Sequence, residues 1–324
     1  MTVPDEAGTG EARPVELSIL VVGYNSAPFL TDCIGAVAAA SARHSCEILF
    51  VNNGTDQSEA LIAERFPGVR VLPSRGNVGF AEANNLLARE ARGRWLVLLN
   101  PDTKLYPGAI DTLVETALAN PDFWVLGGVT VDQTGAFQIH AYPELPTLGT
   151  LLRGLIGRAA RPLRFEPGVA ICPVNVVHGG FLLIERARWE DLGGLDEGFF
   201  LYAEDCDFSK RVADSGGRLG LVPESRIFHD IGSGSVFSPV RKRFQAAGNA
   251  HYFRKHFPGF RGKAAIGLLW AIHLTRFALG FLLSRLRPRY AGMSAGFAQT
   301  ALRPSGWMRG FDSPGADPRR SGDR

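Results

Sequence analysis

The sequence predicts an α/β fold with a mostly parallel central sheet, followed by a helical C-terminal extension. Short apolar runs of strand length alternate with helix-forming segments. The expected strands are 17–23, 47–51, 69–72 and 95–99, and the expected helices are 28–40, 58–66 and one that ends near residue 93. Alternation at this spacing is typical of β-α-β crossovers, which pair strands in parallel. The run Trp-Leu-Val-Leu-Leu at 95–99 contains no polar residue, as expected for a strand covered on both faces.

Further elements continue this alternation in the middle of the chain. We expect helices at 107–118 and 205–214 and a strand at 123–129. An interrupted strand should occupy 174–185, and two short strands should occupy 219–222 and 226–228. The stretch 148–164 is amphipathic and rich in arginine. It fits a surface helix packed on the domain, and equally a flap that faces a second substrate or a membrane.

The composition describes a globular protein. Of its 324 residues, 45% are hydrophobic and 21% are charged, and the formal net charge is only +3, so nothing in the totals requires nucleic acid. The four cysteines lack Cys-x-x-Cys spacing, and the first residues lack an apolar core. We therefore expect reduced thiols, no signal peptide and a cytoplasmic protein.

The chain divides into four predicted parts. Residues 1–14 and 303–324 are rich in Pro, Gly and polar residues, and we expect both segments to be disordered. The main domain should occupy 15–236, and the helical extension should occupy 237–302.

Polar residues gather directly after the predicted strands, and they are Tyr24, Asn25, Asn52, Asn53, Asp56, Asn77, Asn84, Asn85, Asn100 and Asp102. Because carboxyl ends of parallel strands meet at one edge of a sheet, we expect these side chains to line one crevice. Asp102, beside Pro101, could hold a divalent cation against a diphosphate, or it could cap a helix. A dinucleotide site is disfavoured, because the first loop at 23–28 has one glycine rather than the GxGxxG pattern.

Two histidines and an acidic cluster lie in the second half. His178 precedes two glycines that would permit a close approach by a ligand, and His229 precedes a Gly/Ser-rich loop that could bind metal or diphosphate. Either histidine could instead be structural. Glu204, Asp205 and Asp207 start a helix just after aromatic residues, and apolar surroundings raise a carboxyl pKa, which suits a general base.

The order of these motifs resembles the inverting glycosyltransferases of family 2 with the GT-A fold, in particular the bacterial rhamnosyltransferase-like group. The motifs that carry the resemblance are Val-Val-Gly-Tyr-Asn-Ser (21–26), Val-Asn-Asn-Gly-Thr-Asp (51–56), Asn-Val-Gly-Phe-Ala-Glu-Ala-Asn-Asn (77–85), Leu-Leu-Asn-Pro-Asp-Thr (98–103), Phe-Phe-Leu-Tyr-Ala-Glu-Asp-Cys-Asp (199–207) and His229 before its glycines. One departure is Asn52, where the family usually has Asp. An amide oxygen can also accept a hydrogen bond from a pyrimidine, although without charge.

The resemblance implies roles for individual residues. Tyr24, Asn25, Asn52, Asp56, Asn77, Gly79, Asn84 and Asn100 would bind the nucleotide-sugar donor. Asp102 and His229 would hold Mg²⁺ or Mn²⁺, and Asp205 would be the catalytic base. His178, Glu204 and Asp207 would contact the acceptor or orient the base.

The expected reaction is a single displacement that inverts the anomeric carbon. Asp205 would take the proton of an acceptor hydroxyl while the metal neutralises the departing nucleoside diphosphate. The donor suggested by the resemblance is dTDP-rhamnose, and the acceptor is a cell-envelope or polysaccharide glycan, including one linked to polyprenyl diphosphate. Two alternatives remain. One is a catalytically silent glycan-binding or scaffold protein of the same fold. The other is a sugar-nucleotide pyrophosphorylase, which would need a glycine-rich loop that 23–30 lacks.

An apolar stretch at 264–283 concerns the location of the enzyme. It holds His273, Thr275 and Arg276 near its middle and is flanked by basic residues. A central arginine is costly in a spanning helix. An in-plane helix at the inner face of the cell membrane fits the stretch, and so does a packed soluble helix.

Overall fold

The computed structural model describes residues 14–132, 134–138, 144–158, 165, 168–229 and 238–311. Its strands are β1 (Leu17–Gly23), β2 (Cys46–Asn52), β3 (Arg70–Leu72), β4 (Trp95–Leu99), β5 (Thr103–Leu105), β6 (Phe123–Val131), β7 (Cys172–Pro173), β8 (Phe181–Glu185) and β9 (Arg218–His229). Its helices are α1 (Ala27–Ala40), α2 (Ser58–Arg65), α3 (Phe80–Glu90), α4 (Ala109–Ala119), α5 (Leu148–Leu155), α6 (Arg186–Asp191), α7 (Glu204–Asp214), α8 (Pro239–His256), α9 (Phe260–Ser284) and α10 (Ala291–Leu302).

The strands form one sheet in the order β3-β2-β1-β4-β8-β6-β9-β5, and β7 pairs with β9. The predicted α/β architecture is confirmed: β3, β2, β1 and β4 are parallel, and so are β6 and β9. Every residue of β4 is buried, as its apolar sequence predicts, because β1 and β8 flank it and helices cover both faces. The loops after β1, β2 and β4 therefore open on one edge.

Three features of the sheet differ from the expectation. Strand β8 is antiparallel to both neighbours, and the residues 174–180 before it are not strand. The two short strands expected near residue 222 are one strand, β9, with a register shift between the Gly128–Val222 and Val129–Arg226 pairs. The short β5, which pairs antiparallel with β9, was not expected, because three residues are too few to show a periodic pattern.

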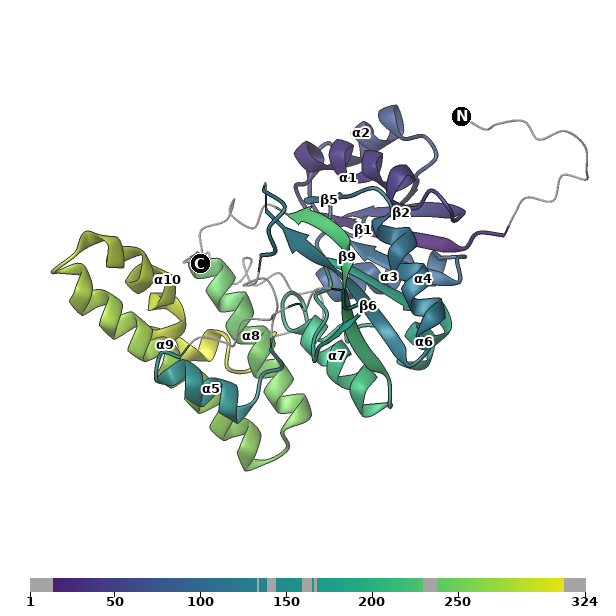
Figure 1. Ribbon diagram of the computed structural model, residues 1–324. Coiled ribbons are helices and arrows are strands. Elements are labelled where there is room, and N and C mark those ends of the chain that lie inside the picture. Colours follow the sequence, from purple (N-terminus) through teal and green to yellow (C-terminus); the bar gives the residue numbers. More distant parts are fainter. Residues whose placement is uncertain are drawn as a thin grey trace, which may run out of the picture.

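Three apolar cores hold the elements together. Helices α1, α2 and α4 pack on one face of the sheet, and α3, α6 and α7 pack on the other. A third core joins α5, α8 and α9 to Phe199, Ala203 and Cys206 at the start of α7. The helical extension thus lies against the end of the sheet domain that carries the acidic cluster, as Figure 1 shows.

The chain after residue 302 needs a correction. We expected 303–324 to be disordered, but Trp307 is only 1% exposed and its indole N–H donates to the Thr300 carbonyl at 2.8 Å. A large aromatic side chain has enough apolar area to order a short segment that is otherwise rich in Gly and Pro. The prediction for 312–324, and that for 1–13, falls outside the described residues.

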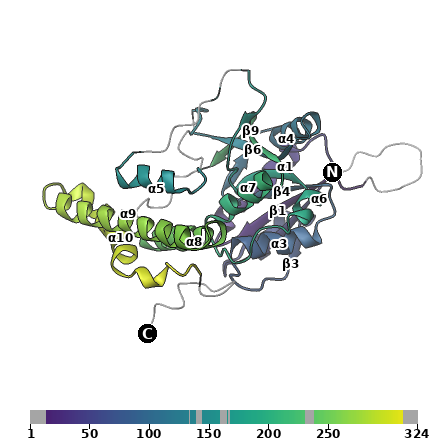
Figure 2. The same cartoon turned by 90° about the horizontal axis from the view of Figure 1, so that it is seen from below.

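Among the described helices, α9 is long and apolar enough to cross a membrane by length and composition, a test that core helices of soluble proteins also pass. One side of it is packed: His273 is buried, and Arg276 donates to the Gly154 carbonyl of α5 at 3.0 Å. The other side exposes Leu279, Phe281 and Leu282. Figure 2 shows α9 and α10 extending side by side away from the sheet.

Candidate active site

The loops after β1 and β2 are tied together by Asp56. Its Oδ2 accepts the N–H of Ala27 at 2.9 Å, and its Oδ1 accepts the N–H of Ser58 and the amide of Asn52, each at 3.3 Å. Burial alone would raise the pKa of Asp56, but these donors bring it below its ordinary value. Asp56 therefore shapes the loop, and contact with the donor remains a prediction.

Asn52 and Asn53 end β2 with different hydrogen bonding. Asn52 is 3% exposed, and its Oδ1 accepts the N–H of Gly54 at 2.9 Å. Asn53 donates to the Gly79 carbonyl at 2.9 Å, while its buried Oδ1 has no hydrogen-bond partner. Because buried acceptors are normally paired, this atom marks a place where a ligand could donate. The sequence puts Asn53 in the crevice, but nothing in the motif distinguishes it from Asn52.

The first loop lies directly against the second. A Cβ on Gly54 would be 2.6 Å from the backbone nitrogen of Asn25, whose φ is 52°. Tyr24 is 42% exposed at the same edge. The two predicted nucleotide loops are thus in contact, and the Tyr24 ring is accessible to a ligand.

The loop before α3 connects the donor side to the segment before α7. Gly79 has a φ of 92°, and a Cβ there would lie 2.5 Å from the Phe200 carbonyl oxygen. The N–H of Phe80 donates to that same oxygen at 2.8 Å. Asn77 accepts the N–H of Gly79 at 3.3 Å and so fixes the turn. Only glycine meets both requirements at position 79.

Asn84 was predicted to bind the donor, and the structure corrects this. It is 1% exposed and donates to the Phe80 carbonyl one turn earlier at 2.9 Å, because its position on α3 faces the core. The adjacent Asn85 pairs with the backbone of Leu195 through both ends of its amide, at 2.8 and 2.9 Å. Both side chains are structural.

Asn100 and His178 converge at the carboxyl end of β4. The N–H of Asn100 donates to the Gly180 carbonyl at 2.8 Å. A Cβ on Gly180 would lie 3.0 Å from the Asn100 amide nitrogen and 3.1 Å from His178 Nδ1. The glycines after His178 therefore permit a close approach of protein groups, as well as leaving room for a ligand.

The two predicted metal ligands, Asp102 and His229, are brought near each other by the pairing of β5 with β9. β5 begins one residue after Asp102, and its Thr103 pairs with His229; the His229 side chain lies outside the described part. Asp102 is exposed and borders a cavity of about 700 Å³ whose other walls come from α1, β5 and Phe228. Burial, with the Asp102 charge, raises the pKa of nearby Cys33 to about 12, so this thiol stays protonated.

The described residues contain no group of three His, Cys, Asp or Glu side chains that could enclose a metal ion. One exposed carboxylate nevertheless suits Mg²⁺, which in nucleotide enzymes keeps water ligands and binds substrate phosphates. Asp102 thus fits a cation that arrives with a diphosphate, and it does not fit a closed metal cage.

Asp205 lies beside His178 at the start of α7. Its Oδ1 accepts the N–H of Cys206 at 2.8 Å, and its Oδ2 is 4.0 Å from His178 Nε2. The N–H of Gly180 donates to His178 Nδ1 at 3.0 Å, which leaves the ring proton on Nε2, facing Asp205. The Asp205 side chain is 12% exposed and is therefore mostly buried beside His178.

Glu204 is the buried partner of this pair. It is 6% exposed, and its Oε2 has no hydrogen-bond partner. Burial first, and then the Asp205 charge, raise the pKa of Glu204 well above its ordinary value. Glu204 therefore holds a proton at neutral pH.

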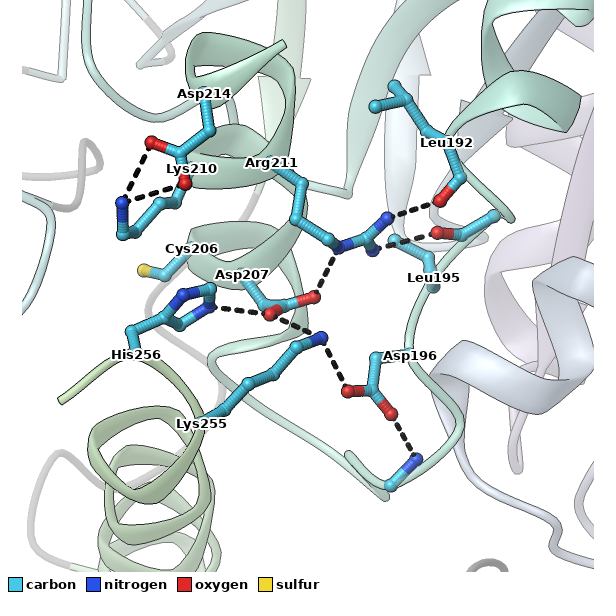
Figure 3. Close-up of polar contacts among 12 residues, drawn as sticks. Leu192, Leu195, Asp196, Cys206, Asp207, Lys210, Arg211, Asp214, Lys255 and His256 are labelled. Atoms are coloured by element: carbon cyan, nitrogen blue, oxygen red, sulfur yellow. Dashed lines mark hydrogen bonds and ion pairs between the residues drawn. The ribbon is translucent and has the colours of Figure 1, made fainter. Parts of the chain in front are cut away.

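Asp207, two residues further into α7, contacts three basic side chains (Figure 3). Its carboxylate accepts hydrogen bonds or ion pairs from Arg211 at 2.8 Å and from Lys255 and His256 of α8 at 2.7 Å each. Its side chain is fully buried, so it does not contact an acceptor; it joins α7 to α8. The sequence missed Lys255 and His256, because basic residues in a last helical turn are expected on dipole grounds alone.

Comparisons with known proteins agree with this geometry. Residues 18–176 match the model for glycosyl transferase family 2. The chain is 30% identical over 237 residues to an N-acetylglucosaminyl-diphospho-decaprenol L-rhamnosyltransferase of Mycobacterium tuberculosis. The matched region covers 66% of this chain and 75% of the relative. It is 24% identical over 178 residues to the rhamnosyltransferase WbbL of Escherichia coli K12, which covers 52% of this chain and 66% of the relative.

A solved structure shares the fold over nearly the whole chain. The mannosyltransferase of Pyrobaculum calidifontis, in complex with GDP-Man and Mn²⁺, superposes with a TM-score of 0.55 at 18% identity, covering 92% of this chain and 91% of that one. With the sheet edge and the sequence matches, this shows that the chain belongs to glycosyl transferase family 2 and is a glycosyltransferase with the GT-A fold.

Proposed function

We propose that the enzyme transfers L-rhamnose, with inversion, from a nucleoside-diphosphate donor to a hydroxyl of a lipid-diphosphate-linked glycan. The observation that carries the proposal is the position of Asp205, whose Oδ2 lies 4.0 Å from His178 Nε2, because His178 and Asn100 both lie against Gly180 at the end of β4. The rhamnosyltransferase relative supports the choice of sugar.

The chemistry assigned to the chain is a proton transfer coupled to one displacement. The acceptor oxygen attacks the anomeric carbon, its proton moves to Asp205, and the bond from that carbon to the phosphate oxygen breaks. His178 Nε2–H keeps the Asp205 carboxylate turned toward the acceptor. Glu204, being protonated, adds no second charge that would compete for the proton.

The donor would lie against the loops after β1 and β2. Tyr24 and Asn25 are the accessible groups there, and the unpaired Oδ1 of Asn53 could accept a hydrogen bond from the base. Asn52 and Asp56 would act through the loop that they hold. Asn77, Gly79 and Asn100 would face the sugar diphosphate.

Asp102, with His229, would hold Mg²⁺ or Mn²⁺. The bound cation would neutralise charge on the departing diphosphate. The solved mannosyltransferase contains Mn²⁺ with its nucleotide sugar, which supports a divalent metal here.

We further propose that the protein works at the inner face of the cell membrane. The relative's name specifies a decaprenol-linked substrate, and α9 exposes apolar side chains next to Arg285, Arg287 and Arg289. Peripheral contact of this kind combines apolar burial with attraction to anionic lipid.

The test is a panel of nucleotide sugars assayed with a prenyl-diphosphate-linked glycan, with and without Mg²⁺ or Mn²⁺. We expect turnover with dTDP-rhamnose, loss on chelation, and a large loss in Asp102→Ala that added Mn²⁺ does not fully restore. Normal turnover of Asp102→Ala would contradict its role. Absence of metal-dependent transfer or hydrolysis with every donor would favour a binding protein over an enzyme.

A further inference from the structure

A cavity of about 420 Å³ lies inside the helical extension, between α8, α9 and α10. Its polar and aromatic walls are formed by Lys242, Gln245, Asn249, His273, Arg276 and Phe297. The volume is within the range of small-molecule sites. None of these residues belongs to the active site described above.

Two cations in the wall lack a counter-charge. Lys242 donates to the Gln245 side-chain oxygen at 3.3 Å and lies 5.3 Å from the centre of the Phe297 ring. Arg276 donates to the Gly154 carbonyl. Within the described parts of the chain, neither forms an ion pair with a carboxylate, although both are half-buried. Burial lowers the pKa of Lys242, and so does neighbouring Arg241. A partly desolvated lysine that lies near a second cation, Arg241, favours an anionic ligand.

His273 adds a second, independent observation. It is 7% exposed, lies against the rings of Phe297 and Trp307, and its Nδ1 has no hydrogen-bond partner among the residues that the structure describes. Burial lowers the pKa of His273 to about 4, so the ring is neutral at pH 7. A buried polar atom in a cavity wall without a partner indicates that a ligand completes the site.

The cavity borders α8, the helix that also packs against the segment before Asp205. Arg241, next to Lys242, forms a hydrogen bond with Tyr202, three residues before Asp205. Gly248, on the same helix, is so close to the Tyr202 carbonyl that a Cβ would lie 2.1 Å from it. One helix, α8, therefore separates the base from the cavity.

We propose that this cavity binds the diphosphate of the lipid-linked acceptor. Lys242 and Arg276 pair with its phosphate oxygens, and His273 Nδ1 supplies a further hydrogen bond. The inference rests on the proposed function for the acceptor class, which the name of the mycobacterial relative supports. The exposed apolar side chains Leu279, Phe281 and Leu282 follow Arg276 along the same helix.

Binding is tested on the full chain without metal or donor, by calorimetric titration with farnesyl diphosphate and with inorganic pyrophosphate. Lys242→Met keeps an apolar side chain beside Phe297 and removes the positive charge. Arg276→Gln removes the positive charge of the other cation in the cavity wall. We expect each to weaken both probes by about tenfold, the usual effect of one lost charge-assisted hydrogen bond. Lys263→Met, on the exposed side of α9, is the matched control and should bind normally.

Three results would overturn the proposal. The first is an unchanged dissociation constant in both cavity variants. The second is no binding of either probe to the wild-type protein. The third is binding of phosphatidylglycerol vesicles that depends equally on Lys242, which would assign the cations to bilayer headgroups. Melting temperatures near that of the wild-type protein show that the variants are folded.

A transfer assay separates this proposal from the proposed function. Lys242→Met should raise KM for the prenyl-diphosphate acceptor and leave kcat unchanged with a soluble acceptor that has no diphosphate. Equal losses with both acceptors would place Lys242 outside diphosphate recognition. Absence of transfer in the wild-type enzyme would count against the reaction, while the titration would still decide the cavity.

Discussion

The first turns of α7 contain two acidic regions with opposite surroundings. Glu204 and Asp205 have no lysine or arginine partner among the described residues, and His178 Nε2 lies 4.0 Å from Asp205 Oδ2. Asp207, two residues on, contacts Arg211, Lys255 and His256. An uncompensated carboxylate remains able to accept a proton, whereas a compensated one stays ionised and holds helices together. The contacts of each carboxylate therefore indicate its role better than its position in the motif does.

The largest expected effect on stability comes from the compensated region. Asp207→Ala leaves Arg211 and His256 without their carboxylate partner, while Lys255 keeps Asp196, and breaking one side of a buried ion pair costs about 3–5 kcal/mol. Urea denaturation measures it. Asp214→Ala is the matched control, because Asp214 pairs with Lys210 on the exposed surface of the same helix, where such pairs contribute about 0–1 kcal/mol. Equal costs for the two variants would contradict the comparison.

The pH dependence of the compensated region has a defined sign. Burial would raise the pKa of Asp207, but its cationic partners bring it below its ordinary value. Its contribution to stability is therefore present at neutral pH and is lost as the pH falls through that lowered pKa.

An intermediate effect on stability is expected at Gly79, because its backbone packs against the segment just before Glu204 and Asp205. Gly79→Ala meets both a φ of 92° and the Phe200 carbonyl, so it should cost about 1–3 kcal/mol and displace the segment before α7. Gly76→Ala separates the two causes, since Gly76 has a φ of 74° but open space around it. If Gly79→Ala is no more destabilising than Gly76→Ala, the contact with Phe200 does not hold this region.

The last effect concerns Glu204, and its size depends on pH. Because its folded pKa is raised, its contribution to stability is full below the unfolded value and is lost as the pH rises through the folded value. Glu204→Gln should therefore stabilise the protein more at pH 8 than at pH 5. Melting curves at both pH values test this, and a pH-independent change would show that Glu204 is ionised in the native state.

Much of the donor edge could be predicted from the sequence. Strands with apolar runs and polar ends place Tyr24, Asn25, Asn52 and Asn100 at one edge by parallel pairing alone. What failed there was the direction of side chains within an element: Asn84 faces the core because of its phase on α3. The sequence motif alone does not show which face of the helix each of its residues occupies.

The acceptor side was less predictable, because its contacts join segments far apart in sequence. Asp207 is paired with residues about fifty positions later, and Trp307 is buried by helices that precede it. The cavity at Lys242 and Arg276 likewise arises from three helices that meet only in the folded chain. Local composition shows basic residues there, but it does not show which of them lack a counter-charge.

The most direct test of the central claim is the transfer rate of two neighbouring variants, Asp205→Asn and Glu204→Gln, measured with saturating donor and acceptor. Each removes one carboxyl group from adjacent positions and keeps its shape. We expect Asp205→Asn to lower kcat by about 10²–10⁴-fold while donor binding persists, and Glu204→Gln to retain most of its kcat. Retained turnover in Asp205→Asn, or an equal loss in Glu204→Gln, would contradict the assignment of Asp205 as the base.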